Sequence, residues 1–105
     1  MWTSISYDEL NDKIVEFEET QIGKLYNFWV TIKIEPAKWN EETYGLDGKG
    51  FWAVALIGKL VIWYNDIEEG FNISRYNHYG VISEYKSNQD ELYITVSLLL
   101  NSIMS

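Results

Sequence analysis

The sequence contains no cysteine, which excludes disulfide bonds and thiolate metal ligands. It also contains a single histidine, His78, so a metal site with two histidine ligands is excluded. No glycine-rich phosphate loop and no nucleophile motif occurs along the chain. We therefore expect neither a cofactor nor a bound metal ion.

Long apolar runs are absent as well. No stretch approaches the roughly 20 consecutive apolar residues that a helix needs to span a bilayer. The amino-terminal MWTSISYDEL has neither the basic start nor the apolar core of a secretory signal peptide. These features predict a soluble, cytoplasmic protein that does not contact a membrane.

Basic residues are scarce, because 8 lysines and arginines stand against 16 acidic residues, for a net charge of -8. Such a charge repels nucleic-acid phosphates, so direct DNA or RNA binding is disfavoured. The same field would speed association with a basic partner, because complementary potentials steer encounter. Many cytoplasmic proteins are this acidic, however, so charge alone does not identify a partner-binding protein.

The chain has 105 residues, 47% of them apolar, which is enough to bury the core of one domain. Ser6, with Glu9 three residues later, forms a capping box that predicts a helix over about residues 7–18. Apolar residues recur along it at near-helical spacing, and acidic residues are expected on a solvated outer face. These are Leu10, Ile14, Val15 and Phe17, and Asp8, Asp12, Glu16 and Glu19.

The segment KLYNFWVTIKIEP, residues 24–36, alternates apolar and polar positions and predicts a strand with one wet face. Pro36 cannot donate to a ladder, so this strand ends there or lies at a sheet edge. Residues 37–50 have no period and contain three glycines, which predicts a loop of about fourteen residues. Loops this long in a small domain are usually functional or mobile.

Residues 51–65 form two apolar runs joined by Gly58-Lys59, a pattern typical of a two-residue hairpin turn. Both faces of this hairpin are apolar, so either both are covered or one is left for a partner. The implied register pairs Ile57 with Leu60, Ala55 with Ile62 and Ala53 with Tyr64 on one face, with Trp52 and Trp63 on the other.

Residues 81–85 could add a further strand, preceded by a short one at 71–75. Asn88 as N-cap, with Glu91 three residues on, predicts a C-terminal helix. No charged side chain occurs from Leu92 onward, so this helix should be buried or docked over most of its surface, against the alanine face of the hairpin. Helices at both ends of a strand block predict a single α+β domain over the whole chain, with a largely antiparallel sheet of about three to five strands.

His78 has the side chain best suited to acid–base catalysis near neutral pH, with Asp66, Glu68 or Glu69 as a carboxylate that orients it. The surrounding NHYG sequence is more typical of an exposed polar turn. Adjacent acidic residues on a strand point to opposite faces, so the acidic doublets do not predict the paired carboxylates of a glycosidase. A small enzyme or ligand-binding domain that uses His78 is therefore the minority interpretation.

Two irregular segments, 37–50 and 64–80, interleave aromatic and acidic residues, a composition frequent at protein–protein interfaces. Their carboxylates could stand where phosphates lie in a basic groove, with rings where bases stack. The alternative is that the tyrosines pack under the loops and the acids only solvate them. The residues predicted to contact a partner are Trp39, Glu41, Glu42, Asp47, Asp66, Glu68, Glu69, Tyr76 and Tyr79.

Residues 51–100, FWAVALIGKLVIWYNDIEEGFNISRYNHYGVISEYKSNQDELYITVSLLL, resemble small bacterial immunity-type proteins. The likeness lies in a tryptophan-bearing hairpin, an acidic DIEEGFN turn, a YG.I.EY strand and an NQDEL helix start. It implies a cytoplasmic, non-enzymatic immunity protein that neutralises the toxin of a contact-dependent growth inhibition or polymorphic toxin system. Such toxins are often nucleases with basic active sites, which agrees with the acidic charge. The resemblance implies no particular binding residue.

The sequence therefore favours an inhibitor that occludes the active site of a basic toxin domain, either an RNase or a tRNase, with an acidic aromatic surface. A third possibility is a homodimeric scaffold that docks through its uncharged C-terminal helix.

Overall fold

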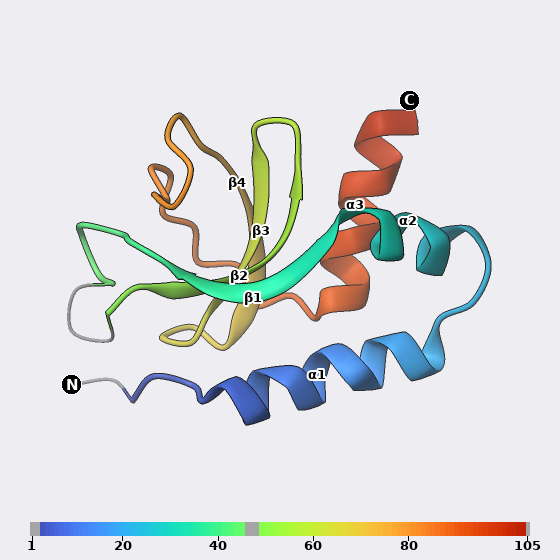
Figure 1. Ribbon diagram of the computed structural model, residues 1–105, viewed down its shortest axis with the longest axis horizontal. Helices are drawn as coiled ribbons and strands as arrows, with labels where there is room; N and C mark the ends of the chain where they lie inside the picture. The colour runs from blue at the N-terminus through green and yellow to red at the C-terminus, as the bar shows by residue number, and fades with distance from the viewer. Residues whose placement is uncertain (1–2, 46–48, 105) are drawn as a thin grey trace.

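The computed structural model describes residues 3–45 and 49–104. Within these residues the fold is α+β, as predicted, and its strands form one antiparallel sheet in the order β1-β2-β3-β4 (Figure 1). The helices are α1 (Tyr7–Thr20), α2 (Lys24–Ile32) and α3 (Leu92–Met104), and the strands are β1 (Lys33–Trp39), β2 (Phe51–Ile57), β3 (Leu60–Asn65) and β4 (Gly70–Arg75).

Helix α1 begins where the capping box predicts. The Ser6 hydroxyl accepts a hydrogen bond from the Glu9 backbone N–H, and the Glu9 carboxylate accepts one from the Ser6 backbone N–H. Three of the four predicted apolar residues are buried, while Val15 is 38% exposed. The helix is therefore fixed at its first turn by capping and along its length by one apolar stripe.

The prediction of a strand from residue 24 is wrong, because residues 24–32 form helix α2. Gly23 precedes it with φ of 73°, a conformation that glycine adopts without strain. The apolar residues of this segment also fit a helix, since they recur at intervals of three and four. Strand β1 starts only at Lys33, and Pro36 lies in it at the edge of the sheet, where its missing N–H is tolerated. The apolar side chains that α2 turns toward the core are Leu25, Phe28, Trp29 and Ile32.

The hairpin forms with the predicted turn, and its register is as expected from Ile57–Leu60 to Ala55–Ile62. Beyond that point the register shifts, and Ala53 pairs with Trp63 instead of Tyr64. Because of this irregularity, the side chains of the β2 residues that precede it point to the opposite side of the sheet from the one predicted. As a result Ala53 and Trp63 pack in one core and Trp52 in the other, so the predicted alanine face contains only Ala55.

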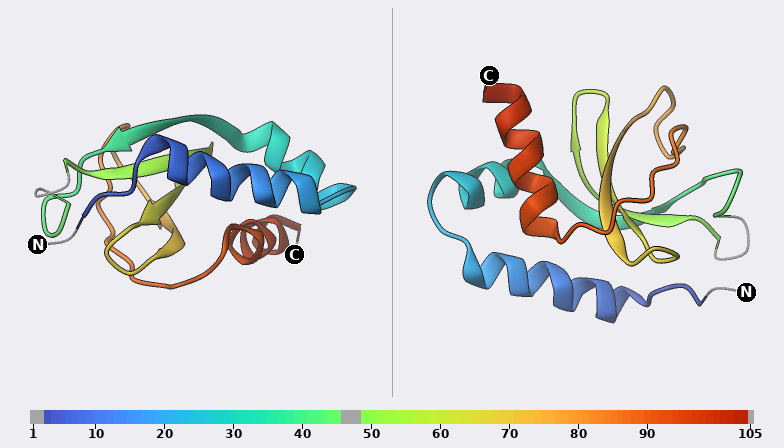
Figure 2. Two further views of the ribbon diagram at one scale, coloured as in Figure 1. Left: turned by 90° about the horizontal axis from the view of Figure 1, so that it is seen from below. Right: turned by 180° about the vertical axis from the view of Figure 1, so that it is seen from behind.

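The three helices cover one face of the sheet and build the larger core, in which buried residues of α1, α2 and α3 meet β2, β3 and β4. Both views of Figure 2 show α1 running alongside the sheet and reaching α2 and α3 at its C-terminal end. The other face carries a second core around Trp39, Phe51 and Trp63, closed by the irregular chain that follows β4. Neither face of the sheet is left bare.

The chain after β4 differs from the predicted arrangement. The expected short strand at 71–75 is the full strand β4, whereas residues 81–85 form only a single bridge, between Val81 and Asn40. Asn88 is not a helix cap, because its backbone N–H donates to the Asn72 side chain at 2.9 Å and α3 begins at Leu92. The Ser74 hydroxyl donates to the Glu84 carbonyl at 2.6 Å, which ties this chain to the sheet.

Helix α3 packs against the sheet face that contains Ala55. This chain does not bury most of the surface of α3, so the expectation of burial is wrong, and docking of its outer side on a partner stays a prediction. Its inner residues are buried, whereas several large apolar side chains on its outer side are exposed. Among the described residues, no helix is both long and apolar enough to cross a membrane.

Candidate functional site

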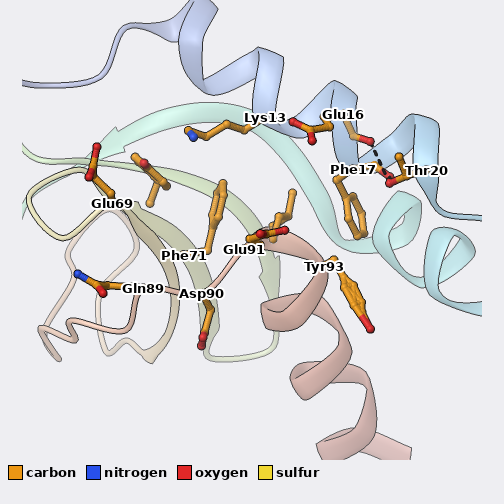
Figure 3. A pocket seen from close by; sticks show the side chains of 12 residues that line it. Lys13, Glu16, Phe17, Thr20, Glu69, Phe71, Gln89, Asp90, Glu91 and Tyr93 are labelled. Atoms are coloured by element: carbon orange, nitrogen blue, oxygen red, sulfur yellow. Dashed lines mark hydrogen bonds between the residues drawn. The ribbon is translucent and has the colours of Figure 1, made fainter.

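A groove runs between α1, the β3–β4 turn and the first residues of α3 (Figure 3). It consists of two adjoining hollows of about 270 and 480 Å³, which share Lys13, Tyr64 and Glu69 in their walls. We call this feature the acidic groove. Its charged lining residues are Glu9, Asp12, Lys13, Glu16, Asp66, Glu69, Asp90 and Glu91.

Helix α1 supplies one wall, because its polar residues recur at spacings of three and four and therefore share one face. Figure 3 shows Lys13, Glu16 and Phe17 extending from α1 over the strands. With about one carboxylate per turn, neighbouring charges stand roughly 5 Å apart along the helix axis. The residues of this wall are Glu9, Asp12, Lys13, Glu16, Phe17 and Thr20.

The opposite wall is the β3–β4 turn, which is shaped by Asn65. Its side-chain carbonyl accepts hydrogen bonds from the backbone N–H groups of Ile67 (3.0 Å) and Glu68 (3.2 Å). Glu69 then adopts φ of 59°, in the left-handed region that non-glycine residues rarely enter. This constrained turn places Asp66 and Glu69 in the groove.

The floor of the groove is the ring of Tyr64, which is buried and packs edge-on against Phe71 at 4.8 Å. Burial, followed by the charges of Glu69, Asp66 and Glu9, raises the pKa of Tyr64 above its ordinary value. The phenol therefore stays neutral at physiological pH and offers an aromatic face rather than a further charge.

Only one of the two carboxylate oxygens of Asp66 has a hydrogen-bond partner. Its Oδ2 accepts a hydrogen bond from the backbone N–H of Ile5 at 2.7 Å, whereas its buried Oδ1 has no hydrogen-bond partner. Burial lowers the pKa of the neighbouring Lys38, and the charge of Asp66 opposes that shift. A buried carboxylate oxygen without a hydrogen-bond partner is costly, so this side of Asp66 lowers the stability of the turn.

The other predicted contact residues do not join the acidic groove. Glu41 is 5% exposed, and its Oε1 accepts the backbone N–H groups of Thr43, Tyr44 and Gly45 at 3.0, 2.6 and 3.0 Å. The Glu41 carboxylate therefore stabilises the loop to which it belongs and is not available to a partner. Glu42 is exposed on that loop, and Asp47 lies outside the described residues.

Glu68 belongs to the second face of the sheet. Burial raises the pKa of Tyr85, a hydrogen bond from Asn65 opposes this shift, and the charges of Glu68 and Glu41 raise the pKa further. The Tyr85 ring packs against the Tyr44 ring in a tilted arrangement, with the ring centres 4.4 Å apart. The β3–β4 turn therefore divides its acids between two surfaces, with Asp66 and Glu69 in the groove and Glu68 beside Tyr85.

The three predicted aromatic anchors do come together. The Trp39 ring lies 5.0 Å from the rings of both Tyr76 and Tyr79. Trp39 is buried, and the Tyr76 hydroxyl donates to the Gly58 carbonyl at 3.0 Å, so both are held in the second core. Only Tyr79, which is 71% exposed, presents most of its ring to solvent.

His78 is exposed in the turn after β4. The acids proposed as its orienters, Asp66 to Glu69, precede that strand. The six residues of β4 separate the two segments by about 20 Å. The structure does not bring His78 together with these carboxylates, so the geometry required for a shared acid–base site is not present.

Sequence reasoning missed most of the acidic groove. Glu9 was assigned only to a cap, and Asp12 and Glu16 to a solvated helix face. The spacing of three and four was a usable signal, but the wall that faces α1 depends on how the β3–β4 turn and residues 89–91 fold. Among residues 3–45 and 49–104, no group of three or more potential ligands could hold a metal ion.

No protein-family model matches the chain, and no curated protein or solved structure matches it either.

Proposed function

We propose that this protein binds a basic partner protein in the acidic groove and inhibits it. In its specific form, the proposal is an immunity protein, made in the cytoplasm, that neutralises a toxin domain with nuclease activity. The observation that carries the proposal is the charge of the groove, where seven carboxylates line the described walls and Lys13 is the single basic residue among the lining residues.

The chemistry of the groove favours cationic side chains. An arginine or lysine of a partner would meet carboxylates from α1 on one side and from the β3–β4 turn on the other. The face of Tyr64 adds a cation–π contact, which Lys13 already makes with its Nζ 5.6 Å from the ring centre.

A nuclease is the partner class that best suits this surface. Its active site is built to hold phosphates, so a row of carboxylates along α1 can occupy the same cationic positions. The net charge of -8 would also steer the encounter. The resemblance of residues 51–100 to immunity-type proteins supports the same partner class.

Catalysis by the protein itself is the weaker alternative, because exposed His78 lies at the opposite end of β4 from Asp66 and Glu69. We propose no catalytic residue.

The test is inhibition of the toxin domain encoded beside the gene. We expect stoichiometric loss of nuclease activity with the wild-type protein, and at least a tenfold weaker complex with the groove variant Asp12→Asn/Glu16→Gln/Glu69→Gln. The matched control Asp8→Asn/Glu19→Gln/Glu42→Gln changes the net charge equally, at exposed residues that do not line the groove. Equal weakening by both variants would leave only a general charge effect, and no weakening by either would place the interface elsewhere.

A further inference from the structure

The segment that precedes α1, residues 3–5, passes beside the β3–β4 turn without forming a strand (Figure 2). We call this segment the strap. Its Ile5 N–H donates to Asp66 Oδ2 in the turn at 2.7 Å, and its Ile5 carbonyl accepts from the Trp52 indole of β2 at 3.0 Å. Ile5 is therefore held between an inner strand of the sheet and the turn that forms one wall of the acidic groove.

A third contact fixes the strap to β1. The Lys38 amino group donates to the Ser4 hydroxyl at 2.7 Å and lies 5.1 Å from the centre of the Trp52 ring. Within the described part of the chain, the strap makes no hydrogen bond from backbone to backbone. Side-chain contacts, together with packing of Ile5 on the larger core, keep it in place. Segments held in this way open more readily than strands of a sheet.

The strap also belongs to the acidic groove, because residues 3–5 line its larger hollow together with Asp66 and Glu69. While the strap is closed, Asp66 Oδ2 accepts from Ile5 and Oδ1 is buried without a partner. The strap therefore competes with an incoming cation for this carboxylate. We propose that the strap is an autoinhibitory element of the acidic groove, which a cationic side chain of the partner displaces from Asp66. This inference rests on the proposed function, since it concerns regulation of the same groove.

The exchange of the strap for a cation is favourable at Asp66 itself. A hydrogen bond from a guanidinium or ammonium group to a carboxylate is roughly twice as strong as one from a neutral donor. Opening, however, breaks three hydrogen bonds and uncovers Ile5, so the strap stays closed in the free protein. The apparent affinity of the groove is then reduced by the fraction of molecules in which the strap is open. A weaker strap should consequently bind a cationic partner more tightly, whereas loss of a purely supporting segment would weaken binding.

Amide exchange of the full chain, followed by NMR at low salt with octa-arginine as the probe, tests the displacement. In the free protein the Ile5 N–H should exchange roughly tenfold more slowly than that of exposed Thr3. Saturation with octa-arginine should remove most of this protection. The Leu10 N–H, which donates to the Ser6 carbonyl at 3.0 Å, should stay protected and thereby exclude unfolding of α1. Continued protection of Ile5 in the complex, or failure of octa-arginine to bind, would overturn the proposal.

Two substitutions loosen the strap and leave every carboxylate of the groove in place. Ser4→Ala removes the acceptor of Lys38, and Trp52→Phe removes the donor to the Ile5 carbonyl. Each should speed exchange at Ile5 and tighten the octa-arginine complex by about three- to fivefold in calorimetric titration. Thr3→Ala is the matched control, since none of the three hydrogen bonds involves its hydroxyl, and it should change neither quantity. Weaker binding by both strap variants would contradict autoinhibition and make the strap a support of the groove.

Inhibition of the toxin domain separates this inference from the proposed function. If the wild-type protein inhibits the toxin domain while Ile5 stays protected in that complex, the strap proposal fails and the proposed function stands. If octa-arginine displaces the strap but the toxin domain is not inhibited, the proposed function fails and the strap remains the regulator of a cation-binding groove.

Discussion

The amino group of Lys13 lies 5.6 Å above the centre of the Tyr64 ring, amid the carboxylates of the acidic groove. Lys13 therefore occupies the place that the proposed function assigns to a cationic side chain of the partner. It acts as an internal counter-ion, and it must move aside or share the ring when a partner binds.

Removing this counter-ion should tighten the complex. Lys13→Gln leaves the Tyr64 ring open and makes the groove wholly anionic, so we expect the dissociation constant for the basic toxin domain to fall by roughly three- to tenfold. Isothermal titration calorimetry measures the change. Lys24→Gln is the control, since it removes the same charge from an exposed position that does not line the groove. Weaker binding by Lys13→Gln would assign Lys13 to the contact itself.

Glu41 should matter for stability and little for binding. Substitution by alanine leaves the three backbone N–H groups of residues 43–45 without their acceptor, and we expect a loss of about 2 to 3 kcal/mol in the free energy of unfolding. Urea denaturation provides the measurement. The neighbouring Glu42→Ala, at an exposed site, should change stability by less than about 0.5 kcal/mol. Equal effects of the two substitutions on the free energy of unfolding would show that the hydrogen bonds to Glu41 do not stabilise the fold.

The Glu18 carboxylate makes part of the stability depend on pH. Its Oε2 accepts from the Trp29 indole and from the Lys33 amino group, both at 2.7 Å. Burial alone would raise the pKa of Glu18, but these two partners lower it by more, so the folded pKa lies below the ordinary value of 4.5. A lowered folded pKa stabilises the protein above the unfolded pKa, and this contribution disappears as the pH falls through the folded value.

Glu18→Gln should therefore lower the free energy of unfolding by about 1 kcal/mol near neutral pH, because the contact is partly exposed. We expect the difference from wild type to shrink as the pH falls below about 4.5, measured by urea denaturation across pH. Glu19→Gln, at the next and exposed position, should show no such trend. A difference that grows on acidification would contradict the assigned sign.

Gly70 allows the chain before α3 to approach the β3–β4 turn. A Cβ atom there would lie 2.4 Å from the Asn88 carbonyl oxygen and 2.4 Å from the Gln89 Cα, both backbone atoms that cannot move alone. Gly70→Ala should cost about 2 to 4 kcal/mol of stability and displace the acids of residues 90–91 from the groove. Thermal denaturation and backbone amide exchange of residues 88–91 report the two effects.

The control for Gly70 is Gly58→Ala, at the hairpin turn. Nothing lies within 4 Å of an added Cβ there, and the only penalty is the φ of 57°, worth about 1 to 2 kcal/mol. If Gly70→Ala left amide exchange at residues 88–91 unchanged, the close packing of this segment would not be what positions Asp90 and Glu91.

Local signals predicted the parts of the fold that depend on neighbours in sequence. The capping box of Ser6 and Glu9 and the Gly58-Lys59 turn both formed, because capping and tight turns are decided within a few residues. The segment 24–32 was missed since its apolar residues fit a period of two as well as a period of 3.6. Packing of Trp29 against Phe17 of α1, and burial of Ile32 in the same core, decided in favour of the helix.

The candidate site was harder to predict, because its walls come from segments distant in the chain. Asp66 and Glu69 were expected to contact a partner, but their neighbours in space are Glu9 and Asp12 on α1. The single register shift in the hairpin moved Trp52 to the other core, and no local signal in the sequence announced it. Whether the groove residues contact a partner stays a prediction.

The salt dependence of association with the toxin domain tests the account most directly. Stopped-flow fluorescence should give a wild-type association rate that falls steeply as the salt concentration rises. The variant Asp12→Asn/Glu16→Gln/Glu69→Gln should associate roughly tenfold more slowly at low salt and show a clearly flatter dependence, while Asp8→Asn/Glu19→Gln/Glu42→Gln stays close to wild type. A wild-type rate that is independent of salt, or identical slopes for both variants, would contradict the claim that the acidic groove receives the partner.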